Sequence, residues 1–418
     1  MGTNFFRENA VMAKYENEKG FTRRDFLKTV GLAGIASTGI EATKALAAQE
    51  QSDGKTASIP RRKLGKTGVE VSALALGGMF DTVNNQLLLR QARNWGVTYW
   101  DTAEGYGNGL SEEGFGRFFA RNPEARKEIF LVTKFRAAQP ANMTESIDKA
   151  LKRLSTDYVD LFFVHGISDF KEIGDPVKEW ASQMKKAGKF KFFGFSTHTN
   201  MEDCLLAAAK TDWIDTIMFS YNFRLMQTQK MKDAVSACAG TGIGMVAMKT
   251  QGGGPIKTDS EAELQMAGRF LERGFTDKQA KIKAILENPN IASICSQMPS
   301  LTILSSNVAA ARDLTSLAAE DFDLLNRFAA ETQNGYCAGC GRICSEAAGG
   351  VVPISDVMRC LMYYRDYGER ELARQVFADL SEESRSRLTE TDYSLAEKRC
   401  PQGLAIAALM REAHELLA

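Results

Sequence analysis

The sequence lacks net charge and long apolar runs. Its 418 residues contain 52 Lys and Arg against 52 Asp and Glu, so the formal net charge is zero, and no run of five like charges occurs. Nucleic acids and anionic membrane surfaces are bound through concentrated positive charge, so we expect no nucleic-acid partner. No stretch approaches the roughly 18 to 20 consecutive apolar residues that cross a bilayer, so we expect no membrane span.

Cysteine is scarce and unevenly placed. There are eight cysteines, too few for a disulfide scaffold of this size, and none precedes Cys204. Four are interpreted as packed thiols, namely Cys204, Cys238, Cys295 and Cys360. The crowding of the others toward the C-terminus predicts a local metal site there.

The N-terminus has the order of an export signal. Residues 22–28 read TRRDFLK, residues 29–40 are uncharged, and Ala45-Leu46-Ala47 forms an A-x-A cleavage pattern. The whole resembles a twin-arginine signal; a chance arginine pair on an amphipathic helix is the alternative. The resemblance implies removal of residues 1–47, transient contact with the twin-arginine translocase, and export of a folded, cofactor-bearing chain to the periplasm or another extracytoplasmic space. Residues 48–60 then form a flexible linker.

The middle of the chain alternates short apolar runs with helical patterns. Eight strands with intervening helices predict a (β/α)8 TIM barrel over residues 61–325. A doubly wound sheet competes, but it favours a G-x-G-x-x-G turn after its first strand, which residues 76–79 (LGGM) do not supply. The expected strands are 71–76, 98–100, 129–133, 159–164, 190–195, 216–219, 243–248 and 291–295.

Four polar residues fall at the ends of successive strands, where barrel enzymes place their active sites. Asp101, Lys134 and His165 end the second, third and fourth expected strands, and Tyr106 follows Asp101 in a loop. A neighbouring ammonium lowers the pKa of a phenol, and a carboxylate holds that ammonium in place. With His165 hydrogen-bonded to a carbonyl oxygen, Tyr106 is the expected general acid of carbonyl reduction.

Longer segments around these residues resemble the aldo-keto reductase family. The resemblance is carried by GVTYWDTAEGYG at 96–107, VTK at 132–134 and LKRLSTDYVDLFFVH at 151–165, and it runs in order from about 64 to 305. The family's Asp, Tyr, Lys and His map onto the four residues at the strand ends. The resemblance implies a small-molecule carbonyl or alcohol substrate and NADP(H) or NAD(H) extended across the barrel mouth.

The cofactor residues of the family are matched less completely. Ser196 is present on the fifth strand, but Met218 stands where a Gln would contact the carboxamide. The basic residues that clamp the 2′-phosphate after the eighth strand are missing, because no Lys or Arg occurs from 296 to 311. Lys249, before a run of three Gly, and Arg224, past the sixth strand, are the candidate phosphate ligands.

The tail carries the remaining cysteines. Thiolates spaced C-x2-C wrap one metal centre, and a remote Cys-Pro closes the fourth corner. The set Cys337, Cys340, Cys344 and Cys400 resembles a ferredoxin-type 4Fe-4S site, with Ile343 where the third cysteine of the ferredoxin pattern would be. A barrel with such a tail resembles the iron–sulfur branch of the family. Zinc is the main alternative, but it favours a second C-x2-C pair. Residues 326–418 are expected to form a mostly α-helical domain.

These features predict an exported oxidoreductase in which Tyr106 is the general acid and the cluster is structural or exchanges electrons with a redox partner protein. Hydride transfer moves two electrons and a cluster moves one, so the two do not couple directly. A protein of electron transfer or assembly, on a barrel that no longer binds NADP, is the alternative. Binding of NADPH discriminates between them.

Overall fold

The computed structural model describes residues 58–136, 139–253 and 261–418, and Ser58–Ala418 form one compact unit. The segment that resembles an export signal, and most of the expected linker, lie outside the described residues. Among the residues that are described, no helix is long and apolar enough to cross a bilayer.

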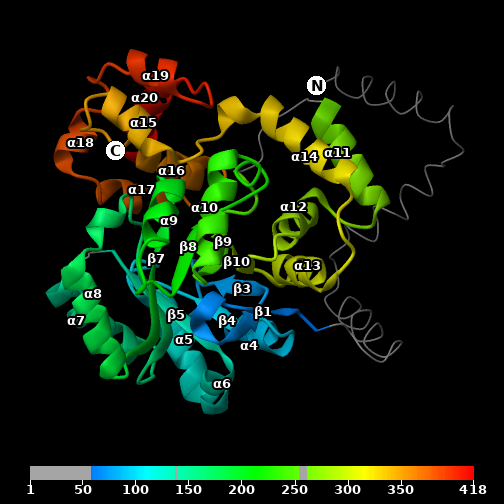
Figure 1. Ribbon diagram of the computed structural model, residues 1–418, viewed down its shortest axis with the longest axis vertical. Helices are drawn as coiled ribbons and strands as arrows, with labels where there is room; N and C mark the ends of the chain where they lie inside the picture. Colours follow the sequence, from blue (N-terminus) through cyan, green and yellow to red (C-terminus); the bar gives the residue numbers. More distant parts are fainter. Residues whose placement is uncertain (1–57, 137–138, 254–260) are drawn as a thin grey trace, which may run out of the picture. The chain divides into compact units, whose positions relative to one another are not determined.

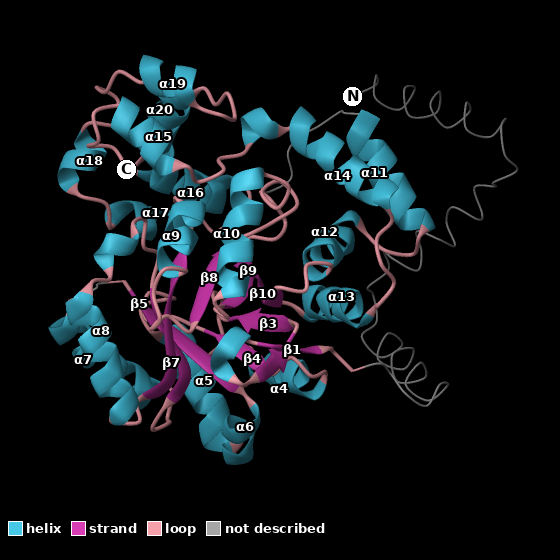
Figure 2. Cartoon of the chain, viewed as in Figure 1, coloured by secondary structure: helices cyan, strands magenta, loops and turns pink. Residues whose placement is uncertain are grey.

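Eight parallel strands close into a barrel in the order β10-β3-β4-β5-β6-β7-β8-β9, as the sequence predicts (Figures 1 and 2). Each expected strand is present, with bounds shifted by up to three residues. Their bounds are β3 (Leu74–Gly77), β4 (Tyr99–Asp101), β5 (Phe130–Phe135), β6 (Val159–Val164), β7 (Phe190–Thr197), β8 (Thr216–Ser220), β9 (Gly244–Met248) and β10 (Ile291–Gln297).

Alternate residues of each strand point into the barrel or toward the helices. On β6, Leu161 and Phe163 belong to the interior cluster, while Phe162 and Val164 pack in the larger core outside. Inside the barrel, the rings of Tyr99 and Phe130 meet edge to face. Because both faces are buried, the strands read in the sequence as continuous apolar runs rather than as alternating ones.

An N-terminal hairpin that the sequence did not indicate covers the amino end of the barrel. It pairs β1 (Arg61–Lys63) with β2 (Glu70–Ser72) across the 3-10 turn η1 (Gly65–Thr67). The expected strand 71–76 is therefore two strands, because the Ser72 hydroxyl accepts the backbone N–H groups of Thr98 and Tyr99 in place of a ladder. Gly65 has φ of +54°, and a Cβ there would collide with the backbone at Gly242.

The outer helices begin with the residues that favour helix starts. Pro123 and Pro140 stand at first helical positions, and Thr228 and Thr276 cap helices with their hydroxyls. The elements are α4 (Gln86–Asn94), α5 (Leu110–Arg121), α6 (Pro123–Glu128), α7 (Pro140–Arg153), η2 (Phe170–Glu172), α8 (Asp175–Lys186), α9 (Met201–Ala208), α10 (Gln229–Gly240), α11 (Glu261–Glu272), α12 (Asp277–Leu286) and α13 (Leu301–Arg312).

The residues after the barrel are helical and have a core of their own. Buried side chains such as Val357, Leu361, Phe377 and Met410 form this second core. The helices are α14 (Ala319–Glu331), α15 (Gly341–Ala347), α16 (Ile354–Arg365), α17 (Arg370–Ala378), α18 (Glu382–Ser386), α19 (Ser394–Arg399) and α20 (Ile406–Leu417), with the 3-10 turn η3 (Gln333–Gly335) after α14. We call residues 333–418 the C-terminal helical region.

The C-terminal helical region docks on the carboxyl ends of the barrel strands (Figure 1). Hydrogen bonds join the two at several strand ends: Asn200 N–H to Gly339 O (2.7 Å), Asn222 Nδ2 to Tyr336 OH (2.9 Å) and Gln297 Nε2 to Glu369 Oε1 (3.0 Å). The mouth of the barrel is therefore covered by helices that follow it in the chain.

Candidate active site at the barrel mouth

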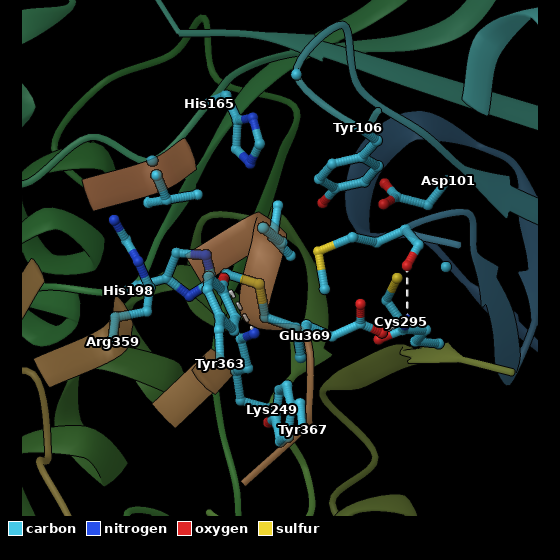
Figure 3. A pocket seen from close by; sticks show the side chains of 18 of the residues that line it. Asp101, Tyr106, His165, His198, Lys249, Cys295, Arg359, Tyr363, Tyr367 and Glu369 are labelled. Carbon is cyan, nitrogen blue, oxygen red and sulfur yellow. Dashed lines mark hydrogen bonds between the residues drawn. The ribbon is translucent and has the colours of Figure 1, made fainter. Parts of the chain in front are cut away.

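A cavity of about 890 Å³ opens at the carboxyl ends of the strands. Its walls come from the loops after β3, β4, β6, β9 and β10 and from α16 and α17 of the C-terminal helical region. Asp101, Tyr106 and His165 line it, and Figure 3 shows them on one side with Lys249 and Tyr363 on another. The volume is that of a small-molecule or cofactor site.

The structure brings Asp101, Lys134 and Tyr106 together at the wall of this cavity. Lys134 Nζ donates to Asp101 Oδ1 (2.5 Å) and to the carbonyl of Thr102 (2.9 Å), and it lies 3.4 Å from Tyr106 OH. Both charged side chains are almost fully buried. Burial alone would lower the pKa of Lys134, but Asp101 and Tyr106 outweigh it and raise that pKa, so the ammonium stays charged.

The pKa of Tyr106 differs from the sequence expectation. Lys134 does lower it, but burial raises it by more, and the net pKa is above the usual value of 10. The expectation considered only the neighbouring ammonium and omitted the loss of water around the phenol. Tyr106 is therefore a protonated phenol at neutral pH, which is the form a proton donor requires.

His165 is a neutral imidazole beside this group. Its ring meets that of Tyr106 edge to face, with centroids 5.7 Å apart. Burial, together with Lys134 and Arg136, lowers its pKa well below 6.5. A neutral ring carries one N–H donor and one acceptor nitrogen, so it can donate to a substrate oxygen without adding charge.

Local hydrogen bonds hold the loop that carries Tyr106. The backbone N–H of Gly78 donates to Asp101 O (2.7 Å), Thr102 Oγ1 donates to Ser111 Oγ (2.7 Å), and Ser111 Oγ donates to Gly78 O (2.6 Å). A Cβ at Gly78 would lie 2.7 Å from Ser111 Oγ, so only glycine fits. The loop is thus tied to the ends of both β3 and β4.

The three candidate cofactor residues occupy different places. Ser196 is buried at the end of β7, where its Oγ accepts from the backbone N–H of Gly166 (3.0 Å). Arg224 donates to Gly252 O (2.8 Å) and Thr332 Oγ1 (2.7 Å), so its guanidinium joins a barrel loop to the end of α14. Burial lowers the pKa of Arg224 to about 10. Lys249 alone of the three lines the described wall of the cavity.

Lys249 faces aromatic residues of the C-terminal helical region. Its Nζ lies 3.2 Å from Tyr363 OH, and 4.2 Å and 4.9 Å from the ring centroids of Tyr363 and Tyr367. Its backbone has φ of +58°, which is uncommon for a residue with a Cβ and is typical of functional sites. Burial lowers the pKa of Lys249, and Tyr363 offsets part of that effect.

Sequence reasoning missed four residues of this cavity. Arg359, Tyr363 and Tyr367 come from α16 and the turn after it, and Cys295 comes from β10. Cys295 was expected to be a packed thiol, but it lies at the cavity beside Asp101, whose pKa it influences. The rule that found Asp101 would have found it, because Cys295 also lies near the carboxyl end of its strand.

The four cysteines of the tail gather at one place. Burial and, to a smaller extent, the thiols of Cys340, Cys344 and Cys400 together raise the pKa of Cys337 to about 12. Cys344 and Cys400 act on Cys340 in the same way, and Cys400 acts on Cys344. Cys400 is remote in sequence, at the end of α19, but it therefore lies near enough to interact electrostatically with the other three. Within the described ranges, no group of three or more His, Cys, Asp or Glu side chains has the geometry to hold a metal ion.

The cysteine loop reaches the back of the main cavity. Cys337 and Gly339 line a smaller cavity of about 90 Å³ together with His198, Lys249 and Arg359. Those three residues line the main cavity as well. A Cβ at Gly339 would lie 2.3 Å from the carbonyl oxygen of His198, so the loop contacts the barrel directly.

Comparison with known proteins places this geometry in context. The model of the "Aldo/keto reductase family" matches residues 73–331. L-galactose dehydrogenase of Arabidopsis thaliana is 27% identical over 289 residues, 62% of this chain and 90% of its own length. Aldo-keto reductase yakc [NADP(+)] of Schizosaccharomyces pombe is 34% identical over 160 residues, 33% of this chain and less than half (46%) of its own length. Among solved structures, aldo-keto reductase AKR11C1 from Bacillus halodurans (holo form) has a TM-score of 0.55 at 22% identity, covering 64% of this chain and 96% of that one, a likeness of fold.

Proposed function

The chain belongs to the aldo/keto reductase family and is an oxidoreductase, and from this premise we propose that it interconverts a small-molecule carbonyl and its alcohol at the barrel mouth, with Tyr106 as general acid. The observation that carries the proposal is the contact of Lys134 Nζ with both Asp101 Oδ1 (2.5 Å) and Tyr106 OH (3.4 Å) beside the cavity.

Each of the four residues has a distinct task in reduction. His165, as a neutral imidazole, donates its N–H to the substrate carbonyl oxygen. Tyr106 gives its phenol proton to that oxygen as negative charge develops there. Lys134 stabilises the phenolate that remains, and Asp101 holds the ammonium in place. In oxidation of the alcohol the same proton returns to Tyr106.

A nicotinamide dinucleotide, when bound, supplies the hydride. The cavity supports the reacting end of such a group, because Met218 and Met248 offer apolar surface near Tyr106 and His165. Ser196 and Lys249 remain the proposed contacts, whereas the guanidinium of Arg224 is already bonded to protein oxygens. At the carboxyl end of β10, Gln297 donates to the carboxylate of Glu369, which would repel a 2′-phosphate. We therefore favour NAD(H) over NADP(H).

The gathered cysteines support a 4Fe-4S cluster held by Cys337, Cys340, Cys344 and Cys400. A structural zinc site usually contains two C-x2-C pairs, whereas this set contains one, at Cys337 and Cys340. A cluster of several iron atoms spaces its ligands more widely and takes four thiolates. Cys337 lines the small cavity behind Lys249 and Arg359, so a cluster there would lie near the barrel mouth.

Export by the twin-arginine route is part of the proposal and rests on residues 1–47 alone. A chain that acquires a cluster before export fits a route that carries folded proteins. Replacing Arg23 and Arg24 by Lys should leave the protein in the cytoplasm, and equal amounts of the variant and the wild type in the extracytoplasmic fraction would contradict this part.

A second candidate is an electron-transfer or assembly protein that binds no nicotinamide. The contact between Gln297 and Glu369 favours this candidate. It places the turn before α17 against the end of β10, where the family holds the dinucleotide. In this candidate a redox partner protein exchanges electrons with the cluster. The polar groups around Tyr106 would then have no catalytic use.

Anaerobic titration of the full-length protein, purified after maturation in the cytoplasm, tests these proposals together. Broad visible absorbance that dithionite bleaches would support the cluster, and its absence would contradict it. Saturable binding of NADH, with weaker binding of NADPH, would support the reductase. Failure to bind either would favour the second candidate. Tyr106→Phe should bind the dinucleotide like the wild type but reduce carbonyl compounds at least about 100-fold more slowly.

A further inference from the structure

The cavity contains a second pair of a tyrosine and a lysine. Lys249 Nζ lies 3.2 Å from Tyr363 OH, much as Lys134 Nζ lies 3.4 Å from Tyr106 OH. Both tyrosines line the same cavity, and Figure 3 shows them on different sides of it. Tyr106 comes from a barrel loop, whereas Tyr363 comes from α16.

Packing and backbone conformation hold the second pair in place. Tyr363 is 6% exposed and belongs to the core of the C-terminal helical region. Lys249 is fixed by its left-handed backbone and by the rings of Tyr363 and Tyr367. Arg359, one helical turn before Tyr363, also lines the cavity and pairs with Asp356 (2.9 Å). Two cations thus lie near one phenol.

We propose that Tyr363, paired with Lys249, is a second catalytic residue of this site and acts as a general base on the carbon next to the substrate carbonyl. The proposal rests on the proposed function, because it takes the carbonyl to be held at Tyr106 and His165. It assigns to the C-terminal helical region a chemical task in addition to covering the mouth.

The step is balanced within the cavity. The phenolate of Tyr363, paired with Lys249, takes the proton from the adjacent carbon and becomes a phenol, and the electron pair of that C–H bond becomes the second bond between the two carbons. The carbonyl π pair moves to oxygen, which takes the proton of Tyr106 and leaves a phenolate beside Lys134, so a neutral enol forms, or an enediol where the adjacent carbon carries a hydroxyl group. Reversal returns a proton to carbon, and exchange of the Tyr363 proton with solvent labels that carbon. No oxidant or reductant is consumed.

The surroundings of the two phenols shift their pKa values in opposite directions. Burial would raise the pKa of Tyr363, but Lys249 and Arg359 outweigh it and bring the pKa below its usual value. The pKa of Tyr106 is raised. Two titratable groups whose surroundings separate their pKa values are suited to the roles of acid and base. Tyr106 is the acid and Tyr363 the base.

The lining of the cavity indicates the class of substrate. Around the two tyrosines it presents hydrogen-bonding and charged side chains from both the barrel and the C-terminal helical region, including Glu104, Asn108, Gln251, Asp366 and Gln375. Such a wall suits a compound with several hydroxyl groups. A hydroxy-carbonyl compound also has an acidic C–H beside its carbonyl, which the general base requires.

Proton exchange at carbon tests the inference without any hydride donor. The full-length protein, without nicotinamide or dithionite, is mixed with hydroxyacetone or dihydroxyacetone in D2O, and loss of the CH2OH proton signal is followed by NMR. We expect the wild type to exchange these protons well above the buffer rate. Tyr363→Phe and Lys249→Met should each exchange at least about 100-fold more slowly. Tyr364→Phe is the matched control, since Tyr364 follows Tyr363 on α16 but its ring faces Arg370 and Arg374 of α17.

Each outcome decides the inference separately from the proposed function. No exchange of either probe by the wild type, or unchanged exchange by Tyr363→Phe, would overturn it even if carbonyl reduction is observed. Exchange that depends on Tyr363 would support it even if no nicotinamide binds. Should Tyr363→Phe fail to fold, Lys249→Met gives the same comparison, with thermal unfolding as the check on both.

Discussion

Lys134 and Asp101 form an ion pair with 2.5 Å between Nζ and Oδ1, and each side chain is at most 2% exposed. The second carboxylate oxygen of Asp101 is buried and has no hydrogen-bond partner among the described residues. The two charged groups therefore share a single contact, and the ammonium reaches two further oxygens, the carbonyl of Thr102 (2.9 Å) and Tyr106 OH (3.4 Å).

Removing that ammonium should disable proton transfer. We expect Lys134→Met to lower kcat/KM for carbonyl reduction by about 100-fold or more, because the phenolate of Tyr106 loses its stabilising charge. Leaving Asp101 buried and unpaired should also destabilise the fold by about 3–5 kcal/mol. Thermal unfolding and steady-state kinetics measure the two effects.

A double variant separates activity from folding in this pair. Lys134→Met with Asp101→Asn has no unpaired charge, so it should regain much of the stability and none of the activity. Recovery of activity in the double variant would show that Lys134 acts only by neutralising Asp101.

Gly339 fixes the cysteine loop on the barrel. A Cβ there would lie 2.3 Å from His198 O, and φ is +78°. We expect Gly339→Ala to displace the loop and to lower the iron bound per chain by at least about half, since metal sites depend on the groups that orient their ligands. Iron content and visible absorbance are the measurements.

Gly349→Ala controls for backbone strain. Gly349 has φ of +84° but open space around its Cβ position. It should therefore keep its iron. Equal loss in both variants would show that strain, and not the contact with His198, explains the result.

Cys400 should be needed for the proposed iron–sulfur site although it lies far from the other three cysteines in sequence. Cys400→Ala removes one of the four gathered thiols, so we expect the visible absorbance to be lost or greatly reduced. Cys360→Ala alters a fully buried thiol in the core of the same region and should retain the absorbance at some cost in stability. Retention of the absorbance by Cys400→Ala would remove Cys400 from the ligand set.

Two histidines should make the fold sensitive to acid. Burial lowers the pKa values of His165 and His198 well below 6.5, so as the pH falls through about 6.5 the unfolded chain takes up protons that the folded chain does not. The free energy of unfolding should therefore decrease toward lower pH, by up to about 1.4 kcal/mol per pH unit for each histidine.

Urea unfolding at several pH values measures this slope. His198→Asn should make it shallower, because one of the two histidines no longer takes up a proton. The exposed His414 serves as the control position, through His414→Asn. Proteins with buried histidines lose stability over roughly pH 7 to pH 5. If the free energy of unfolding had the same pH dependence in the wild type and in His198→Asn over this range, the role given to His198 would be contradicted.

The barrel and the barrel side of the candidate site were predictable from the sequence for one physical reason. Buried parallel strands are continuous apolar runs, and the polar residue that ends a run marks the mouth. That rule located Asp101, Lys134 and His165. The rule does not give the pKa of Tyr106. That pKa depends on how deeply the phenol is buried, and the burial depends on what covers the mouth.

The contribution of α16 was not predictable in this way. Arg359 and Tyr363 lie one turn apart on a helix whose pattern is amphipathic, and periodicity does not say against which surface such a helix packs. Likewise, the division of the expected strand 71–76 into β2 and β3 depends on the Ser72 hydroxyl accepting two backbone N–H groups, which no propensity indicates. Only the folded chain brings these residues to their partners.

The family match ends at residue 331, and the helices that complete the cavity begin after it. A relative can therefore share every barrel residue of this protein and still accept a different molecule, because the opposing wall lies outside the family match. The names of barrel relatives are for that reason a poor guide to the compound this enzyme consumes. Exchange of tails between two such barrels would be expected to exchange their substrates, with Tyr106 left in place.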